Sequence, residues 1–492
     1  MVRVINYLKI ILILTSLVLG ICSCASHSSD GSAEESTTYT PESTAEKKDD
    51  GHVAVPDGVE EAKKYADSLV ASLPDRKLSS DSFSVASAPG IDLAPHDPAD
   101  EYEDALIERN SMVENKYGVT IRQIETPLDL MLSDAYSSYL SGTFYANALL
   151  IPQSAVGEFS QKGFLISAYS LPHIDYDREY FDRDAMSQAS AGYTAPVIAG
   201  AATKDNGSYY CMYVNTSLVG EEESSDIFAA VESGDWTWDM LLQSARHLSD
   251  VNGGFKTIGT KKAGILADVV YLSSGMHYLN TGWAQIPTMA FETDSTVKLI
   301  EIIKNINNAG SAFDDNESDG AELEAFKSGE ILFHIDTVGN MPEVSRMGES
   351  WCALPVPKVS ASQETYCAYC SPEAPVMAVP AGDPATEDSA FVIEALNAAS
   401  YKYLDRSYYH RLVRTSLNNS KTLDMLEYVY GVNGGKGLYD FTTMYSAAFP
   451  QLSYNTTETI WDLAVNGGDL AEAAYNSKYD MNWRFVNAFP MS

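Results

Sequence analysis

Short strand-like runs and longer helical patterns alternate along the first part of the folded chain. Runs at 83–86, 119–121 and 148–151 predict strands, the last of them buried. Between them, apolar positions at helical spacing predict helices over about 101–117 and 129–140. Strands that alternate with helices favour parallel sheets with helices on both faces, so the pattern predicts an α/β protein.

The alternation continues further along the chain. Gly329 is placed to stop a helix that directly precedes a strand. From residue 387 onward the pattern is mostly helical, and no repeat of fixed period is present. The additional elements that we expect are strands at 209–214, 331–335 and 374–380 and helices at 60–73, 294–308 and 321–327.

One helix has an unusually clear beginning. Thr237 stands where an N-cap belongs, because its hydroxyl can accept a hydrogen bond from a free amide of the first turn. Trp236 before it can pack on Leu241 as a hydrophobic staple, and Asp239 places negative charge at the positive end of the helix dipole. Five residues then fall on one helical face, namely Trp238, Leu241, Leu242, Ala245 and Leu248.

The segment 235–239, which reads Asp-Trp-Thr-Trp-Asp, resembles a signature of bacterial extracellular solute-binding proteins, in the maltose-binding-protein-like family that supplies sugars to ABC importers. A second block resembles the same family at 325–333 and 354–358, and a third at 392–396 with Ser400-Tyr401. The resemblance covers most of the chain from about Ser79 onward. It departs from the family at Tyr180-Phe181, where tryptophans are usual.

The resemblance implies a two-lobed periplasmic-binding-protein-like fold of type II, with a hinge of crossing strands at 209–214 and 374–380. A chain of 492 residues also favours more than one globular unit. Ligands of α/β proteins bind outside the carboxyl ends of strands, and lobes of this kind close around a solute. We expect an N-terminal lobe from 79–208 and 374–430, a C-terminal lobe from 209–373, and a C-terminal helical segment, 431–492, packed on the C-terminal lobe.

The start of the chain is typical of a secreted lipoprotein. Basic residues precede an apolar run from Ile10 to Leu19 that is short for a membrane span. The run ends in Ile21-Cys22-Ser23-Cys24, which resembles a lipobox with Cys24 as the acylated residue; Cys22 fits less well because Ile21 is too bulky to precede the cleavage point. We therefore expect a signal peptide at 1–23 and a lipid anchor on the outer face of the cell membrane. An ordinary signal peptide with an incidental cysteine is the alternative.

Residues 24–78 are expected to form the lipidated tether and its lead-in helix. The part from 25 to 58 has almost no large apolar side chains, so it cannot bury enough surface to offset chain entropy. The whole sequence has 68 acidic and 32 basic residues, a formal net charge of −36. Such a surface repels phosphate backbones, so nucleic acid is not an expected partner.

Aromatic and polar residues indicate what the cleft could bind. The sequence has 30 tyrosines, and aromatic faces stack on the C–H faces of sugars while polar side chains bind the hydroxyls. The segment 271–283 is the richest in such residues, and Asp336 follows a predicted strand. The alternative for each is packing or hydrogen bonding unrelated to a ligand. The candidate solute contacts are Tyr271, His277, Tyr278, Trp283, Asp336 and Trp461.

Four cysteines lie beyond the lipobox, including one Cys-x-x-Cys pair, Cys367 and Cys370. A single pair in an oxidising compartment favours neither zinc nor redox catalysis. Cys211 and Cys370 lie near the two predicted crossing strands. The hypothesis is a structural disulfide that involves one of the paired cysteines, and free buried thiols, including Cys352, are the equal alternative.

Motifs for catalysis or metal binding are not found in the sequence. The segment 315–320 begins like a calcium loop, but the twelfth position is Phe326, which cannot ligate a cation. There is no nucleophile elbow, HExxH helix or phosphate-binding glycine loop. We therefore expect no catalysis, cofactor or metal.

The resemblance implies capture of a carbohydrate, in particular an oligosaccharide, and its delivery to the permease subunits of an ABC importer by a monomeric protein. Two alternatives stay open. The same fold can bind a peptide, an amino acid or another small polar solute. A secreted carbohydrate-active enzyme or an adhesion module could carry the same anchor, since glycosidases need only two carboxylates.

Overall fold

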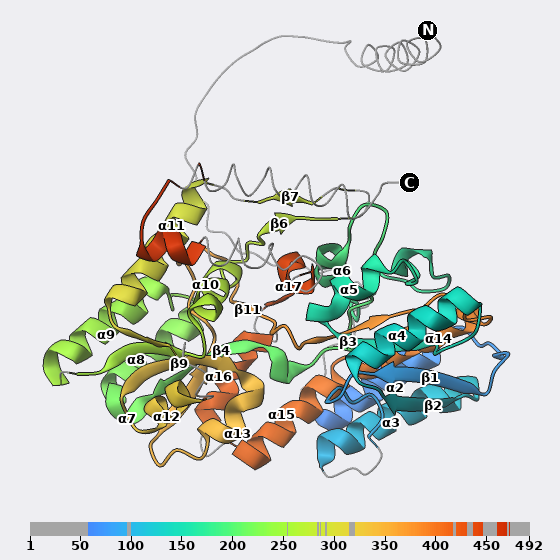
Figure 1. Ribbon diagram of the computed structural model, residues 1–492. Helices are drawn as coiled ribbons and strands as arrows, with labels where there is room; N and C mark the ends of the chain where they lie inside the picture. The colour runs from blue at the N-terminus through green and yellow to red at the C-terminus, as the bar shows by residue number, and fades with distance from the viewer. Residues whose placement is uncertain are drawn as a thin grey trace, which may run out of the picture. The chain divides into compact units, whose positions relative to one another are not determined.

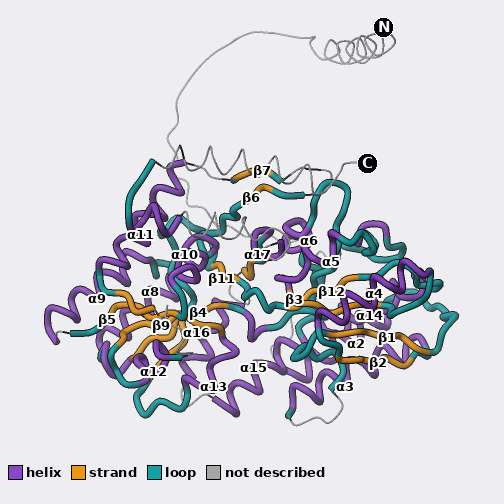
Figure 2. Tube along the Cα trace, viewed as in Figure 1, coloured by secondary structure: helices purple, strands orange, loops and turns teal. Residues whose placement is uncertain are grey.

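The computed structural model describes residues 58–95, 100–252, 254–282, 285, 287–290, 293–313, 320–416, 420–430, 436–445, 460–469 and 472. Figures 1 and 2 show the arrangement of their elements. The helices are α2 (Val59–Ser72), α3 (Glu101–Tyr117), α4 (Leu128–Ser141), α5 (Val156–Gln161), α6 (Arg183–Ala189), α7 (Thr216–Val219), α8 (Glu221–Ser233), α9 (Trp238–Asn252), α10 (Ala263–Leu272), α11 (Thr293–Asn308), α12 (Ala321–Lys327), α13 (Met341–Val344), α14 (Thr386–Ser400), α15 (Tyr403–Ser416), α16 (Ser420–Tyr430) and α17 (Phe441–Tyr445).

The strands form two main sheets and two small ones. They are β1 (Ser82–Ser87), β2 (Thr120–Glu125), β3 (Ala148–Pro152), β4 (Tyr210–Asn215), β5 (Lys256–Thr260), β6 (Leu279–Asn280), β7 (Thr288–Met289), β8 (Ser311–Phe313), β9 (Ile331–Thr337), β10 (Trp351–Leu354), β11 (Cys367–Tyr369), β12 (Pro375–Ala378) and β13 (Lys436–Leu438). Short 3-10 turns include η1 (Gln153–Ala155), η3 (Asn206–Ser208) and η4 (Val338–Asn340).

The first sheet contains the three strands predicted in the first part of the chain. Its order is β12-β3-β1-β2, with β1 parallel to both neighbours and β12 antiparallel to β3. Every residue of β3 is buried, as its continuous apolar run predicts. Helix α3 spans the predicted 101–117, with Asp100 accepting two amides at its start and Gly118 in the left-handed conformation at its end.

The second sheet has the order β10-β4-β9-β5-β8. Strand β5 is parallel to β8 and β9, whereas β4 is antiparallel to β9 and β10. Helix α12 packs on β9 and β5, and α16 packs on β10. The predicted α/β class with parallel-rich sheets and flanking helices is therefore confirmed, with antiparallel strands added at the sides of both sheets.

The chain passes between the sheets where the sequence placed its crossings. Ile198 still pairs with Met377 of the first sheet, and the chain then enters the second sheet as β4. It returns to the first sheet as β12, after Cys370 has paired with Tyr209 at the start of β4. At this crossing, η3 and η4 touch backbone to backbone: a methyl added at Gly339 would lie 3.1 Å from the carbonyl oxygen of Gly207.

The C-terminal region contains a strand that the helical pattern did not predict. Residues 436–438 form β13, which pairs in parallel with β11. The described part of the chain after residue 387 is otherwise mostly helical, as expected. The pattern did not predict β13 because a three-residue strand is fixed by its distant partner and leaves no periodic signal. Helix α16 packs on β10 and α8, while α17 packs on η1, α5 and α6. The lobe boundaries expected from the sequence stay a prediction.

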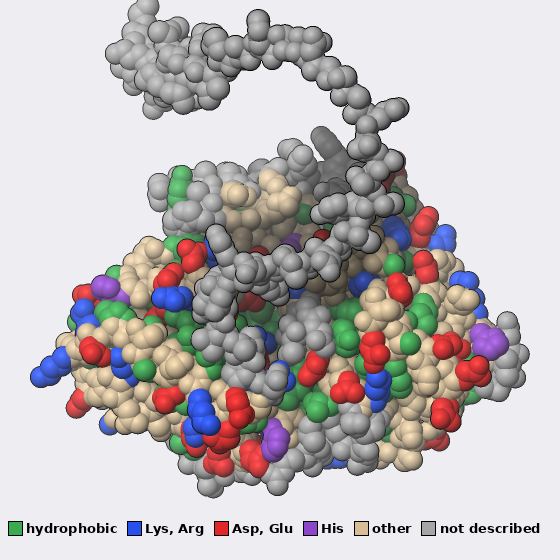
Figure 3. All heavy atoms as spheres, turned by 180° about the vertical axis from the view of Figure 1, so that it is seen from behind, with side chains coloured by type: hydrophobic (Ala, Val, Ile, Leu, Met, Phe, Trp, Pro, Cys, Tyr) green, Lys and Arg blue, Asp and Glu red, His purple; other side chains and the backbone are tan. Residues whose placement is uncertain are grey.

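The surface of the protein carries charges of both signs. On the face shown in Figure 3, acidic and basic side chains are interspersed. Within the described ranges, no helix is both long enough and apolar enough to cross a membrane. The signal peptide and Cys24 lie outside the described residues.

Candidate functional site

Two of the predicted aromatic residues, one in the last turn of α10 and one in the segment after it, lie against each other. The rings of Tyr271 and Tyr278 stack with centroids 4.2 Å apart and planes 14° apart. The turn between them uses Gly275, whose φ of +84° favours glycine. Both tyrosines are buried, and the Tyr278 hydroxyl donates to Asp268 Oδ1 at 2.7 Å. In this structure the pair is therefore part of the core, and its contact with a solute stays a prediction.

His277, between these rings in sequence, is the more accessible member of this group. Its side chain is 19% exposed, and Nδ1 lies 3.4 Å from Oδ2 of the fully buried Asp440. Asp440 also accepts hydrogen bonds from the amide and the hydroxyl of Thr442, and from the Tyr278 amide at 3.4 Å. The structure thus brings Tyr271, His277 and Tyr278 together and adds Asp440, which the sequence analysis did not select.

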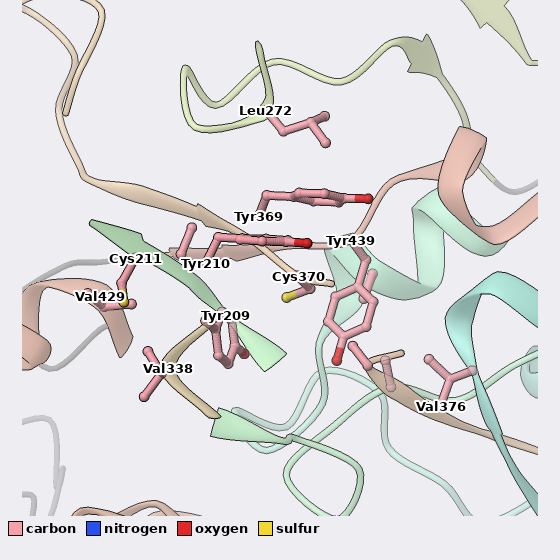
Figure 4. Packing of buried hydrophobic residues seen from close by; sticks show 14 of the residues in the cluster. Tyr209, Tyr210, Cys211, Leu272, Val338, Tyr369, Cys370, Val376, Val429 and Tyr439 are labelled. Carbon is pink, nitrogen blue, oxygen red and sulfur yellow. The ribbon is translucent and has the colours of Figure 1, made fainter. Parts of the chain in front are cut away.

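A second tyrosine stack lies between β4 and β11. The rings of Tyr210 and Tyr369 are 5.5 Å apart with planes 12° apart, and Figure 4 shows them one above the other with Tyr439 beside them. The Tyr369 hydroxyl forms a 2.8 Å hydrogen bond with Thr443 Oγ1. Burial raises the pKa of Tyr369 and Tyr439 well above the usual value, so both rings stay neutral. The high tyrosine count was the only sequence signal for this stack.

Asp336 lies on the other face of the second sheet. It is paired with Cys211 across β9 and β4, and side chains alternate faces along a strand, so it faces away from Tyr210. Asp336 accepts from the Thr337 amide at 2.7 Å and from Asn340 Nδ2 at 2.5 Å. Burial favours a higher pKa for Asp336, but these hydrogen bonds and His334 outweigh it and lower the pKa. The carboxylate therefore shapes η4, and the structure does not bring it to the tyrosine stacks.

Of the two predicted tryptophans, only one lies within the described residues. Trp461 lies in a short helical stretch, 460–465, where it is partly buried and packs against the core. Trp283 lies outside the described residues. Both residues stay predictions as solute contacts.

The cysteines show which of the two sequence alternatives holds. Cys211, Cys352, Cys367 and Cys370 are all buried and free. The hypothesis of a structural disulfide that involves Cys367 or Cys370 is therefore wrong, and the alternative of free buried thiols holds for these four residues. Burial raises the pKa of Cys352 to about 12, which keeps the thiol protonated. Among the described residues, no group of three or more His, Cys, Asp or Glu side chains is placed to hold a metal ion.

Two of the sequence segments that carry the family resemblance, 235–239 and 354–358, meet in the core. Trp236 and Trp238 are fully buried, and Trp236 Nε1 donates to the carbonyl of Pro355 at 3.0 Å. Thr237 pairs with Lys358 in a parallel bridge, flanked by hydrogen bonds of Lys358 with both tryptophans. Thr237 also caps α9 as predicted, since its hydroxyl accepts from the Met240 amide at 3.3 Å. These motifs hold α9 on the second sheet.

The fold of this chain matches solved structures, although its sequence matches no known family model. No protein-family model matches the sequence, and no curated protein matches it. Solved structures do match: a cyclic alpha-maltosyl-1,6-maltose binding protein from Arthrobacter globiformis is 15% identical, with a TM-score of 0.53 and coverage of 82% of this chain and 99% of that one. The sugar-binding protein MalE from Xanthomonas citri is 10% identical, with a TM-score of 0.54 over 82% and 98%.

A third solved structure matches over a similar share of the chain. The galacto-N-biose-/lacto-N-biose I-binding protein of an ABC transporter from Bifidobacterium longum is 12% identical, with a TM-score of 0.52 over 85% of this chain and all of that one. The chain has the two-lobed fold of the extracellular solute-binding proteins. This confirms the resemblance found in the sequence at the level of fold, and the fold spans nearly the whole length of each matched protein.

Proposed function

We propose that this protein captures a carbohydrate outside the cell and delivers it to the permease subunits of an ABC importer. The observation that carries the proposal is the two-sheet architecture, which extends over nearly the full length of several sugar-binding proteins. Such a protein carries out no chemical step. It binds a solute between two lobes, and binding favours the closed form by the difference in affinity between the two forms.

The residues around His277 are suited to a solute that has both polar groups and an apolar face. His277 is partly exposed, the Tyr271–Tyr278 stack lies next to it, and Asp440 lies behind it. An imidazole can donate to or accept from a sugar hydroxyl. The buried rings of Tyr271 and Tyr278 would have to become exposed before either could stack on a sugar ring. We propose this group as one side of the solute site, with Trp283, Asp336 and Trp461 as further candidate contacts.

We also propose that the protein is monomeric and extracellular, and that a lipid on Cys24 anchors it. Lipidation would hold the protein at the outer face of the membrane, with 25–58 as a spacer. A Cys24→Ser variant should appear in the culture medium while the Cys22→Ser variant stays with the membrane fraction. Membrane retention of Cys24→Ser would contradict lipidation at this position.

Solute binding is tested with thermal shift and intrinsic fluorescence on a panel of sugars. The panel holds maltooligosaccharides, cyclic glucose oligosaccharides and lacto-N-biose, with peptides and amino acids as separate arms. We expect one sugar class to raise the melting temperature and change Trp or Tyr emission. His277→Ala should weaken this response, whereas His247→Ala, an exposed histidine of α9, should leave it unchanged.

The outcomes separate the alternatives. A response only to peptides or amino acids would keep the fold and replace the carbohydrate. Hydrolysis products from a polysaccharide incubated with the protein would indicate a carbohydrate-active enzyme. If no member of the panel shifts the melting temperature, carbohydrate capture is rejected.

A further inference from the structure

A short C-terminal segment contacts elements of both main sheets. We call Lys436–Tyr445, which contains β13 and α17, the strap. At its first end, β13 lies parallel to β11: the Lys436 amide donates to the Tyr366 carbonyl and the Cys370 amide donates to the Leu438 carbonyl, both at 2.9 Å. Strand β11 packs on α10 and β4, which belong to the second sheet and its helices. This end of the strap is therefore joined to the second sheet.

The other end of the strap is joined to the first sheet. Helix α17 packs on η1 and α5, which follow directly from β3. The Tyr445 hydroxyl donates to the carbonyl of Ala189 at 2.8 Å, and the Phe441 amide lies 3.4 Å from Gln188 Oε1. All five residues of α17 are buried, and Figure 1 shows the helix between α10 and the pair α5 and α6. These contacts are core contacts rather than an incidental touch at the surface.

Asp440 connects the two ends through hydrogen bonds. Its carboxylate caps α17 by accepting from Thr442, and it also accepts from the Tyr278 amide, which belongs to the turn after α10. Tyr369 of β11 reaches α17 through its hydrogen bond with Thr443. A buried carboxylate is costly unless it is hydrogen-bonded, so moving α10 away from α17 would leave Asp440 without part of its compensation.

We propose that the strap holds the two halves of the fold together before a solute binds, and that it must loosen when the halves separate. Only a minority of the solute-free molecules is then in the open form that can admit a solute between the lobes. The apparent affinity of the protein for its solute is lowered by the fraction of molecules in that open form. The inference goes beyond solute capture, because it concerns the solute-free protein. It can fail or succeed whatever the solute proves to be.

The test is amide hydrogen exchange on the solute-free full chain, with Asp440→Asn as the variant. Asparagine keeps one acceptor oxygen and replaces the other by an NH2 group, which then faces either the Tyr278 amide or the Thr442 donors. Loss of one buried hydrogen bond changes local opening by about tenfold. We expect faster exchange together in peptides over 186–192, 276–280, 366–370 and 440–445. Exchange in β1 and β3 should stay unchanged.

The matched control is Asp100→Asn, the same substitution at the N-cap of α3, far along the chain from the strap. It should change exchange near α3 and near Arg411 of α15, which donates to Asp100, and leave exchange in the strap unchanged. The second variant is Tyr445→Phe, which removes only the hydroxyl that donates to Ala189 and should produce the same pattern more weakly. If either strap variant speeds exchange only within 440–445, Asp440 is a helix cap and the strap proposal is overturned.

Discussion

In this protein, several residues whose type suggests binding or chemistry have a packing role. The tryptophans of the family-like motif and the four cysteines beyond the lipobox look in sequence like candidates for binding or chemistry. The structure buries all of them. A large ring removed from water contributes more to stability than most surface contacts, so Trp236 acts in this fold through packing.

Truncating Trp236 tests this role. Trp236→Ala removes the buried indole and leaves the Pro355 carbonyl without its donor, so the free energy of unfolding should fall by about 3–5 kcal/mol. Urea unfolding followed by circular dichroism measures the change. Leu140→Ala, at a residue that is 67% exposed, is the control and should change stability by less than about 0.5 kcal/mol.

The thiols provide a second test at this scale. Because Cys211, Cys352, Cys367 and Cys370 are buried and their pKa values are raised, none should react with iodoacetamide in the native protein at neutral pH. All four should react in denaturant without prior reduction. Mass spectrometry of the labelled peptides gives the result, and a cysteine that needs reductant before it reacts in denaturant would restore the disulfide hypothesis.

Elements in this fold are joined by side chains far apart in sequence. The segment between α2 and β1 is tied to α14 through Asp388, which accepts from Arg76 Nε at 2.9 Å and from the Ser79 amide at 2.7 Å. Helix α2 itself packs on α14, α15 and α3. The helix expected as a lead-in to the folded body is therefore packed on other helices of that body.

Asp388 should make stability depend on pH in the acid range. Burial favours a higher pKa for Asp388, but the hydrogen bonds from Ser79 and Arg76 outweigh it and lower the pKa. A lowered folded pKa gives stability that is fully present above the unfolded value, near 4, and is lost as pH falls through the folded pKa. Asp388→Asn should flatten this part of the curve of unfolding free energy against pH.

The neighbouring carboxylate supplies the comparison for that experiment. Glu387 also binds Arg76, at 2.8 Å, but its side chain is half exposed. Glu387→Gln should have a smaller effect than Asp388→Asn, because solvent screens an exposed pair. Equal effects of the two substitutions would show that burial of Asp388 contributes nothing.

At the scale of the whole molecule, the two sheets depend on a crossing where backbones touch. Gly207 precedes β4 and Gly339 follows β9, and their backbones lie so close that a methyl added at Gly339 would be 3.1 Å from the Gly207 carbonyl oxygen. Both have ordinary φ values, so the requirement is for space and not for a left-handed conformation. Tyr408 of α15 closes the same point, because its hydroxyl would lie 2.9 Å from a methyl added at Gly207.

Filling this contact should destabilise the protein. In Gly339→Ala the new methyl would lie 3.1 Å from a backbone oxygen that cannot rotate away, so we expect a loss of about 1–3 kcal/mol in the free energy of unfolding. Gly348→Ala is the matched control, since nothing lies within 4 Å of its added methyl. Thermal and urea unfolding measure both variants, and equal stabilities would mean that the crossing adapts without cost.

The sequence by itself determined the local structure and the class of fold. Helical periodicity, the Thr237 cap and the apolar run of β3 are short-range signals, and these elements form where the pattern predicts them. Tertiary structure alone decided that Tyr271 and Tyr278 stack in the core, that Asp336 faces away from Tyr210, that the cysteines stay unpaired and that β13 exists. Each of these depends on which distant segment lies opposite, and neither periodicity nor residue type encodes that neighbour.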